Sequence, residues 1–79
     1  MTNYDKYIEA FCEGLEIAKE KVNEELEYGK CAEWDSVGHM NLIGCIEDKF
    51  EIMLDQDDMM DLLSFNEGKK VLKKYGIEI

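Results

Sequence analysis

Apolar and polar residues along the chain recur with the spacing of amphipathic helices. Near the N-terminus, apolar side chains appear at intervals of three and four residues, which places them on one face of a helix. These residues are Tyr4, Tyr7, Ile8, Phe11 and Leu15. Thr2 or Asn3 can accept a hydrogen bond from the free N–H groups of the first turn. The pattern therefore predicts a first amphipathic helix.

The next segment, EIAKEKVNEELEYGKCAEW (16–34), has no sustained period. Its apolar anchors are scattered, at Ile17, Val22, Leu26 and Tyr28. We therefore expect a long loop that these side chains hold against the core, with a helical turn within 19–25.

The stretch EWDSVGHMNLIGCIEDKF (33–50) predicts the second helix. Asp35 or Ser36 can cap its first turn, and the period continues to about Phe50. With about 100° of rotation per residue, Val37 falls on the outer face, one residue from Ser36. The opposite face collects the residues expected in the core, which are Met40, Leu42, Ile43, Ile46 and Phe50.

Two further helices are predicted in the C-terminal third. The sequence QDDMMDLLSF (56–65) indicates a short third helix whose acidic residues crowd its first turn, where they complement the helix dipole. In the connection before it, Ile52 and Leu54 are expected to point inward. The last helix should begin near Asn66 and stop at Gly76. Its expected core residues are Val71, Leu72 and Tyr75.

The chain contains no proline and no low-complexity linker, which favours a single compact unit. We therefore predict one domain over residues 1–79. Its fold class is all-α, a four-helix bundle with three main helices, one short helix and a long loop between the first two. A chain of 79 residues buries one modest core and leaves little room for a walled catalytic cleft, so its length disfavours an enzyme.

Acidic residues dominate the charge. Asp and Glu number 19 against 9 basic residues, a formal net charge of −10. Residues 1–64 contribute −12 and residues 65–79 contribute +2. This charge repels nucleic acids and anionic membranes and attracts basic partner surfaces. The N-terminal segment has no apolar signal core and no run long enough to span a membrane, so we expect a cytoplasmic protein without stable membrane insertion.

The sequence gives little support to a metal site. Cys12, Cys31 and Cys45 are an odd number with no CxxC pair, which favours free thiols over a disulfide or a zinc site. The acidic DQDDMMDLLSFNE fails as a calcium loop, because Met59 and Met60 occupy the positions of an oxygen ligand and the turn glycine. Four methionines fit either core filling or an adaptable binding groove, namely Met40, Met53, Met59 and Met60.

Ser36 has three possible roles. As a nucleophile it would need a general base, and His39 lies on roughly the same side of the helix. However, WDSVG is not the GxSxG motif, because Trp34 replaces the first glycine and no strand precedes the serine. The hydroxyl can also cap the helix, or accept a phosphate ester where the helix start favours an anion. Helix physics alone leaves the last two open.

The stretch WDSVGHMNLIGCIEDKFEI resembles the 4′-phosphopantetheine site of acyl carrier proteins. The order of segments is similar over the whole chain, from the first helix and long loop to the closing LKKYGI. The usual family triplet is DSL, and Val37 keeps a branched apolar residue after the serine. The resemblance implies that a phosphopantetheinyl transferase esterifies Ser36 with phosphopantetheine from coenzyme A. The thiol of this arm then carries acyl groups as thioesters.

The resemblance also implies that the second helix is the recognition surface of a monomeric, non-catalytic carrier. The implied partner-binding residues are Asp35, Val37, Glu47, Asp48 and Glu51. The partners are the transferase and acyl-loading, elongating or transferring enzymes with basic surfaces, in fatty-acid, polyketide-like or related biosynthesis. Gly38, Asn41 and Gly44 depart from the acids or bulky apolar residues common in the family. Two alternatives stay open, an aminoacyl or peptidyl-type carrier and an unmodified acidic helical adaptor.

Overall fold

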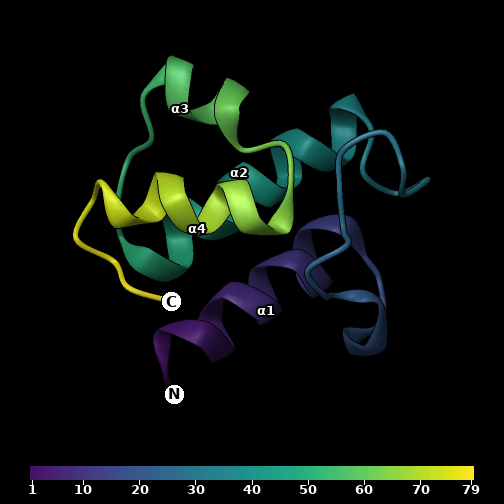
Figure 1. Ribbon diagram of the computed structural model, residues 1–79, viewed down its shortest axis with the longest axis horizontal. Coiled ribbons are helices and arrows are strands. Elements are labelled where there is room, and N and C mark those ends of the chain that lie inside the picture. The colour runs from purple at the N-terminus through teal and green to yellow at the C-terminus, as the bar shows by residue number, and fades with distance from the viewer.

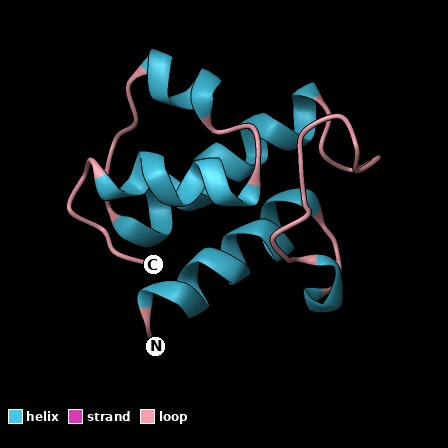
Figure 2. Cartoon of the chain, viewed as in Figure 1, coloured by secondary structure: helices cyan, strands magenta, loops and turns pink.

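A computed structural model describes residues 1–79 as α-helices joined by loops (Figure 1). The elements are α1 (Asn3–Leu15), the 3₁₀ turn η1 (Lys19–Lys21), α2 (Ser36–Phe50), α3 (Gln56–Asp61) and α4 (Phe65–Lys73). Figure 2 shows helices and loops and no strand. The predicted fold class is confirmed: an all-α bundle with three main helices, one short helix and a long loop after the first.

Side-chain caps set where the helices begin. Thr2 caps α1 in a reciprocal capping box with Asp5, so the first helix starts where the sequence predicted. Ser64 caps α4, because its Oγ accepts from the backbone N–H of Glu67 at 2.9 Å. α4 therefore begins at Phe65, directly before the expected start.

α1 and α2 cross at close range. A Cβ on Gly14 would lie 2.6 Å from the Cα of Leu42, so only glycine permits this approach. Beside the crossing, the ammonium group of Lys49 donates to the carboxylates of Glu13 at 2.9 Å and Glu9 at 3.3 Å. The hydrogen bond to Glu13, reinforced by Glu9, holds the pKa of Lys49 above its usual range. The close backbone approach at Gly14 and the ion pairs of Lys49 thus hold α1 against α2.

The core between the helices is rich in aromatic rings. Tyr7, Phe11 and Phe65 pack with ring centroids 4.9 to 5.5 Å apart, and Trp34 from the long loop lies 5.4 Å from Phe11. Of the four anchors predicted for the loop, Ile17, Val22 and Leu26 are buried, whereas Tyr28 is 39% exposed. The loop is therefore part of the core.

Two side chains expected in the core are exposed, Tyr4 to 49% and Met40 to 61%. Tyr4 lies in the first turn of α1. Helical spacing shows which face of a helix is apolar, but it does not show how far along the helix the rest of the protein covers that face. Met40 lies in the second turn of α2 and lines a surface groove instead. Phe50 and Tyr75 are half-buried, whereas the other residues predicted for the cores of α2 and α4 are buried.

α3 lies on the opposite side of the molecule from α1 (Figure 1). Its buried Asp58 accepts hydrogen bonds from the ammonium of Lys74 at 2.8 Å and the hydroxyl of Tyr75 at 2.6 Å. Both bonds hold the pKa of Asp58 below its usual range.

The two ends of the chain lie close together, because the side-chain amide of Asn3 donates to the carbonyl of Glu78 at 3.1 Å. None of the helices is long and apolar enough to cross a membrane.

Candidate functional site

The first turn of α2 presents Ser36 to solvent. The carboxylate of Asp35 accepts from the backbone N–H of Gly38 at 2.8 Å, so Asp35 is the cap of the helix. Ser36 is consequently the first residue inside the helix, and its hydroxyl performs no capping. The one hydrogen bond of this hydroxyl is with the hydroxyl of Tyr28, at 3.3 Å. Of the two roles left open for the serine, capping belongs to its neighbour.

Gly38 has a structural reason to be glycine. A Cβ at this position would lie 2.1 Å from the carbonyl oxygen of Glu33 and 3.2 Å from Cδ2 of Leu15. The loop backbone therefore passes directly against the first turn of α2, which leaves no room for a side chain at this position. Gly44 is different, because nothing lies within 4 Å of its ideal Cβ.

His39 links the loop to α3. Its Nδ1 accepts the indole N–H of the buried Trp34 at 3.0 Å, and since an indole nitrogen only donates, Nδ1 carries no proton. The proton on Nε2 is donated to the carbonyl of Met59 at 2.8 Å. Both nitrogens are thus engaged, and the imidazole has no lone pair for the hydroxyl of Ser36. The Ser36–His39 nucleophile and base considered from the sequence are not paired.

A groove of about 740 Å³ opens beside Ser36, between α2 and α3. Its lining is mainly apolar and consists of Tyr28, Ser36, His39, Met40, Gln56, Met59, Met60 and Leu63. The sequence allowed either a core role or a groove role for four methionines. Three of them line this groove, and the fourth, Met53, is exposed elsewhere. Flexible, polarisable methionine side chains suit a surface that adapts to different ligands.

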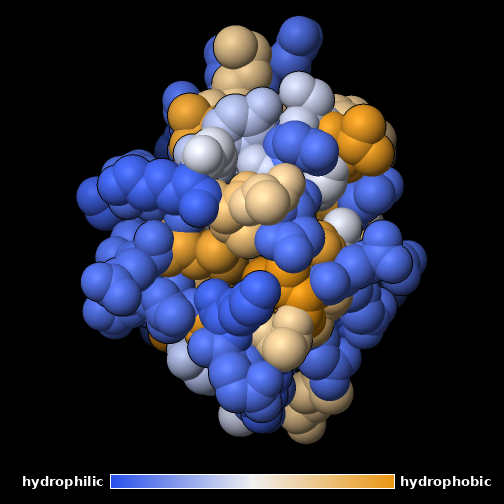
Figure 3. All heavy atoms as spheres, turned by 90° about the vertical axis from the view of Figure 1, so that its right-hand side faces the viewer, coloured by the Kyte–Doolittle hydropathy of each residue, from blue (hydrophilic) through white to orange (hydrophobic).

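The exposed outer face of α2 carries Val37, which is 70% exposed as the sequence predicted. Met40, Met60 and Leu63 are exposed as well, and these three line the groove beside Ser36. Figure 3 turns the side of the long loop toward the viewer, and hydrophobic atoms are visible there between hydrophilic side chains. Singly scattered apolar residues are common on protein surfaces, so the groove beside Ser36 is the more specific feature of this face.

Of the four acids expected to bind partners, Asp35 caps the start of α2, and the other three lie at the far end of the helix. Asp48 is about 18 Å from Ser36 along the axis, at 1.5 Å per residue. Asp48 and Glu51 are exposed, and neither carboxylate has a hydrogen-bond partner in the chain. Glu47 is half-buried, and its carboxylate accepts the backbone N–H of Leu54 at 2.9 Å. Glu47 therefore shapes the α2–α3 connection, while the two exposed acids remain available to a basic surface.

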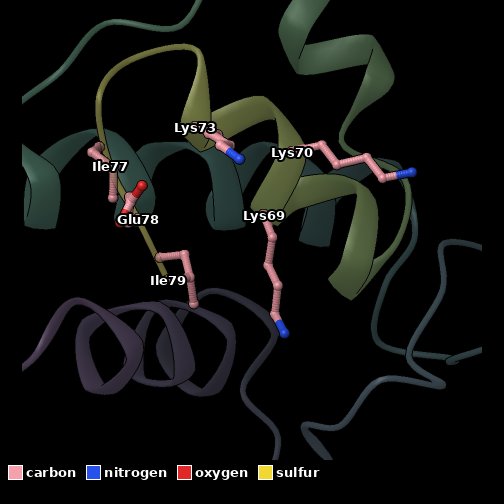
Figure 4. Close-up of a pocket in the computed structure, with 6 residues that line it drawn as sticks. All are labelled: Lys69, Lys70, Lys73, Ile77, Glu78 and Ile79. Carbon is pink, nitrogen blue, oxygen red and sulfur yellow. The ribbon is translucent and has the colours of Figure 1, made fainter.

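A second hollow, of about 280 Å³, lies at the C-terminal end and shares no residue with the groove (Figure 4). Its lining consists of Lys69, Lys70, Lys73, Ile77, Glu78 and Ile79. Figure 4 shows the amino groups of Lys69 and Lys70 pointing in different directions. The ammonium of Lys69 instead lies 4.9 Å from the ring centroid of Phe65. The lysines thus account for the local positive charge without converging on one ligand.

No group of three or more His, Cys, Asp or Glu side chains is arranged to hold a metal ion. All three cysteines are free, and burial raises the pKa of the thiols of Cys12 and Cys45. Comparison with protein-family models, with curated proteins and with solved structures finds no match for this chain.

Proposed function

We propose that the protein is an acyl carrier in which Ser36 bears 4′-phosphopantetheine. The observation that carries this proposal is a contrast between the two serines of the chain, each at the start of a helix. Ser64 caps α4 with its hydroxyl, whereas Ser36 leaves the cap of α2 to Asp35 and is exposed beside an apolar groove. A hydroxyl without a structural task, inside the DSV triplet, is suited to modification.

The modification is a phosphoryl transfer to this hydroxyl. Oγ of Ser36 forms a bond to the β-phosphorus of coenzyme A, the pyrophosphate bond breaks, and adenosine 3′,5′-bisphosphate leaves. The hydroxyl proton passes to a base on the transferase. The product is an anionic phosphodiester at the N-terminus of a 15-residue helix, where the helix dipole stabilises negative charge.

The surroundings of Ser36 suit the carrier role. The apolar groove gives the arm and a short acyl chain a surface to lie against, with adaptable methionines along it. The exposed Val37, next to the serine, contributes an apolar contact for partner enzymes. Asp48 and Glu51 add negative charge for enzymes with basic surfaces, which favours fast, salt-sensitive encounters. A shuttle benefits from such contacts because it leaves each enzyme soon after arriving.

The test is incubation with coenzyme A and a broad-specificity phosphopantetheinyl transferase, followed by intact-protein mass spectrometry. We expect the wild type to gain the mass of one phosphopantetheine and Ser36→Ala to gain nothing. The matched control is Ser64→Asp, which keeps a capping oxygen for α4 but removes the only other serine hydroxyl. This variant should be modified like the wild type.

The rival function is an acidic helical adaptor that binds a basic or amphipathic partner without modification. The exposed acids and apolar residues of α2 would serve it equally well. The adaptor function predicts that the wild-type protein keeps its unmodified mass. A known carrier in the same reaction serves as the positive control for the transferase. If only the known carrier is modified, our proposal is rejected. The aminoacyl or peptidyl-type carrier shares the chemistry of Ser36. Mass spectrometry of the thioester on protein from its own host distinguishes these cargoes.

A further inference from the structure

We infer that Tyr28 is a positioning residue for Ser36, whose hydroxyl holds the serine oxygen in place for phosphopantetheinylation. The inference rests on the proposed function and adds a residue to it from outside the DSV triplet. Tyr28 lies eight residues earlier in the long loop, yet its hydroxyl is 3.3 Å from Oγ of Ser36. Both residues line the same groove.

The ring of Tyr28 is held in place from two sides. It meets the ring of Trp34 edge-on, with centroids 6.4 Å apart, and the ring of His39 edge-on at 5.6 Å. Trp34 is fully buried, and its own hydrogen bond to His39 fixes both of these contacts. Edge-to-face geometry is the favoured packing of aromatic rings. The contacts with Trp34 and His39 thus hold the ring that bears the tyrosine hydroxyl, although part of this ring is exposed.

The backbone of Tyr28 is fixed as well. Its N–H donates to the carbonyl of Leu63 at 2.8 Å, and the N–H of Phe65 donates to the carbonyl of Leu26 at 2.9 Å. These two bonds join the loop to the connection between α3 and α4. The hydroxyl of Tyr28 therefore occupies a defined position relative to the start of α2, as a positioning role requires.

The hydrogen bond matters because nothing else in the chain restrains the side chain of Ser36. A serine side chain has three staggered positions, and the capping bond that would usually select one is made by Asp35 instead. The bond to Tyr28 selects the position in which Oγ faces the groove. In the transfer step this oxygen bonds to the β-phosphorus and its proton goes to the transferase, so Tyr28 itself exchanges no proton. Fixing a reacting atom in advance lowers the barrier of the step.

The experiment compares steady-state modification of the wild type and of Tyr28→Phe by one transferase. Phenylalanine keeps the edge-on contacts with Trp34 and His39 and removes only the hydroxyl. We expect kcat to fall about three- to tenfold, the effect of one hydrogen bond. KM for the carrier should be unchanged, because docking surfaces are intact. Tyr4→Phe is the matched control, since this tyrosine is exposed on α1 and its hydroxyl makes no hydrogen bond.

A purely structural role for Tyr28 would lower thermal stability or raise KM, and neither result fits positioning. Equal kcat for wild type and Tyr28→Phe would overturn the inference while leaving the proposed function standing. A rise in KM alone would overturn it too, by making Tyr28 a docking residue. Failure of the wild type to be modified at all would instead reject the proposed function. A fall in kcat with unchanged KM and unchanged melting temperature supports the inference.

Discussion

The indole N–H of Trp34 donates to Nδ1 of His39 at 3.0 Å, and the two rings are nearly parallel, with an interplanar angle of 17°. Through its other nitrogen, His39 donates to the carbonyl of Met59 in α3. This chain of bonds connects the buried end of the loop, the first turn of α2 and the short third helix. The only histidine of the protein therefore has a structural role beneath the candidate site.

We predict that His39→Ala destabilises the protein by about 1–3 kcal/mol, because it leaves the buried indole donor of Trp34 without an acceptor. Urea unfolding measures the loss. In a double-mutant cycle, adding Trp34→Phe should reduce the cost of His39→Ala, since the donor is then absent. Strictly additive effects would show that the hydrogen bond contributes nothing. Asn41→Ala, at an exposed position on the same helix, should leave stability within about 0.5 kcal/mol.

Sequence patterns predicted α1 and α2 well because helix formation is largely local, whereas α3 ends at Asp61, before the predicted end at residue 65. Apolar residues at helical spacing together with capping residues located α1 and α2 to within a residue or two. Met40 was placed wrongly in the core for a physical reason. Spacing assigns a side of the helix, but whether that side is covered depends on α3, whose six residues leave a groove over Met40.

The site could be predicted only in part. The DSV triplet indicated Ser36 and Val37, since it lies in a continuous stretch of sequence. Tyr28 and Trp34 were not assigned to the site, because their positions follow from the path of an irregular loop that has no period. A signal was present in YGKCAEWDS, where two aromatic residues precede the serine closely. Their contact with His39 became evident only from tertiary structure.

Asp35 caps α2 and Ser36 does not, so the two residues should differ in their effect on stability. Asp35→Ala should cost about 1 kcal/mol of stability, because the N–H of Gly38 loses its acceptor at the start of α2. Ser36→Ala should change stability by less than about 0.5 kcal/mol, since its hydroxyl is exposed and does not cap. Thermal or urea unfolding of the two variants gives the comparison. If Ser36→Ala were the more destabilising change, the serine would be the true cap.

The two glycines of α2 should respond oppositely to alanine. At Gly44 nothing lies within 4 Å of the new methyl group, so Gly44→Ala should stabilise the protein by about 0.5–1 kcal/mol through helix propensity. At Gly38 the methyl group would meet the carbonyl of Glu33 at 2.1 Å, so the loop must move. We expect Gly38→Ala to destabilise the protein despite the better helix former. It should also slow modification of Ser36, two residues away, whereas Gly44→Ala should not.

Tyr7 provides a prediction about pH. Its ring is fully buried, its hydroxyl donates to the carbonyl of Phe65 at 2.5 Å, and burial raises its pKa far above the ordinary value of 10.0. The folded protein therefore keeps this proton while the unfolded chain releases it above pH 10. Stability from this group is fully present below pH 10 and decreases above it, by about 1.4 kcal/mol per pH unit.

Tyr7→Phe removes this titrating group and also the hydrogen bond. Near pH 7 the variant should be less stable by about 1–3 kcal/mol, because the carbonyl of Phe65 loses its donor. Above pH 10 its deficit should shrink, since only the wild type then loses stability through this tyrosine. Urea unfolding between pH 7 and 11 measures both effects, with the exposed Tyr4→Phe as control. A deficit that stays constant across this range would show that the hydroxyl of Tyr7 ionises in the folded protein as readily as in the unfolded chain.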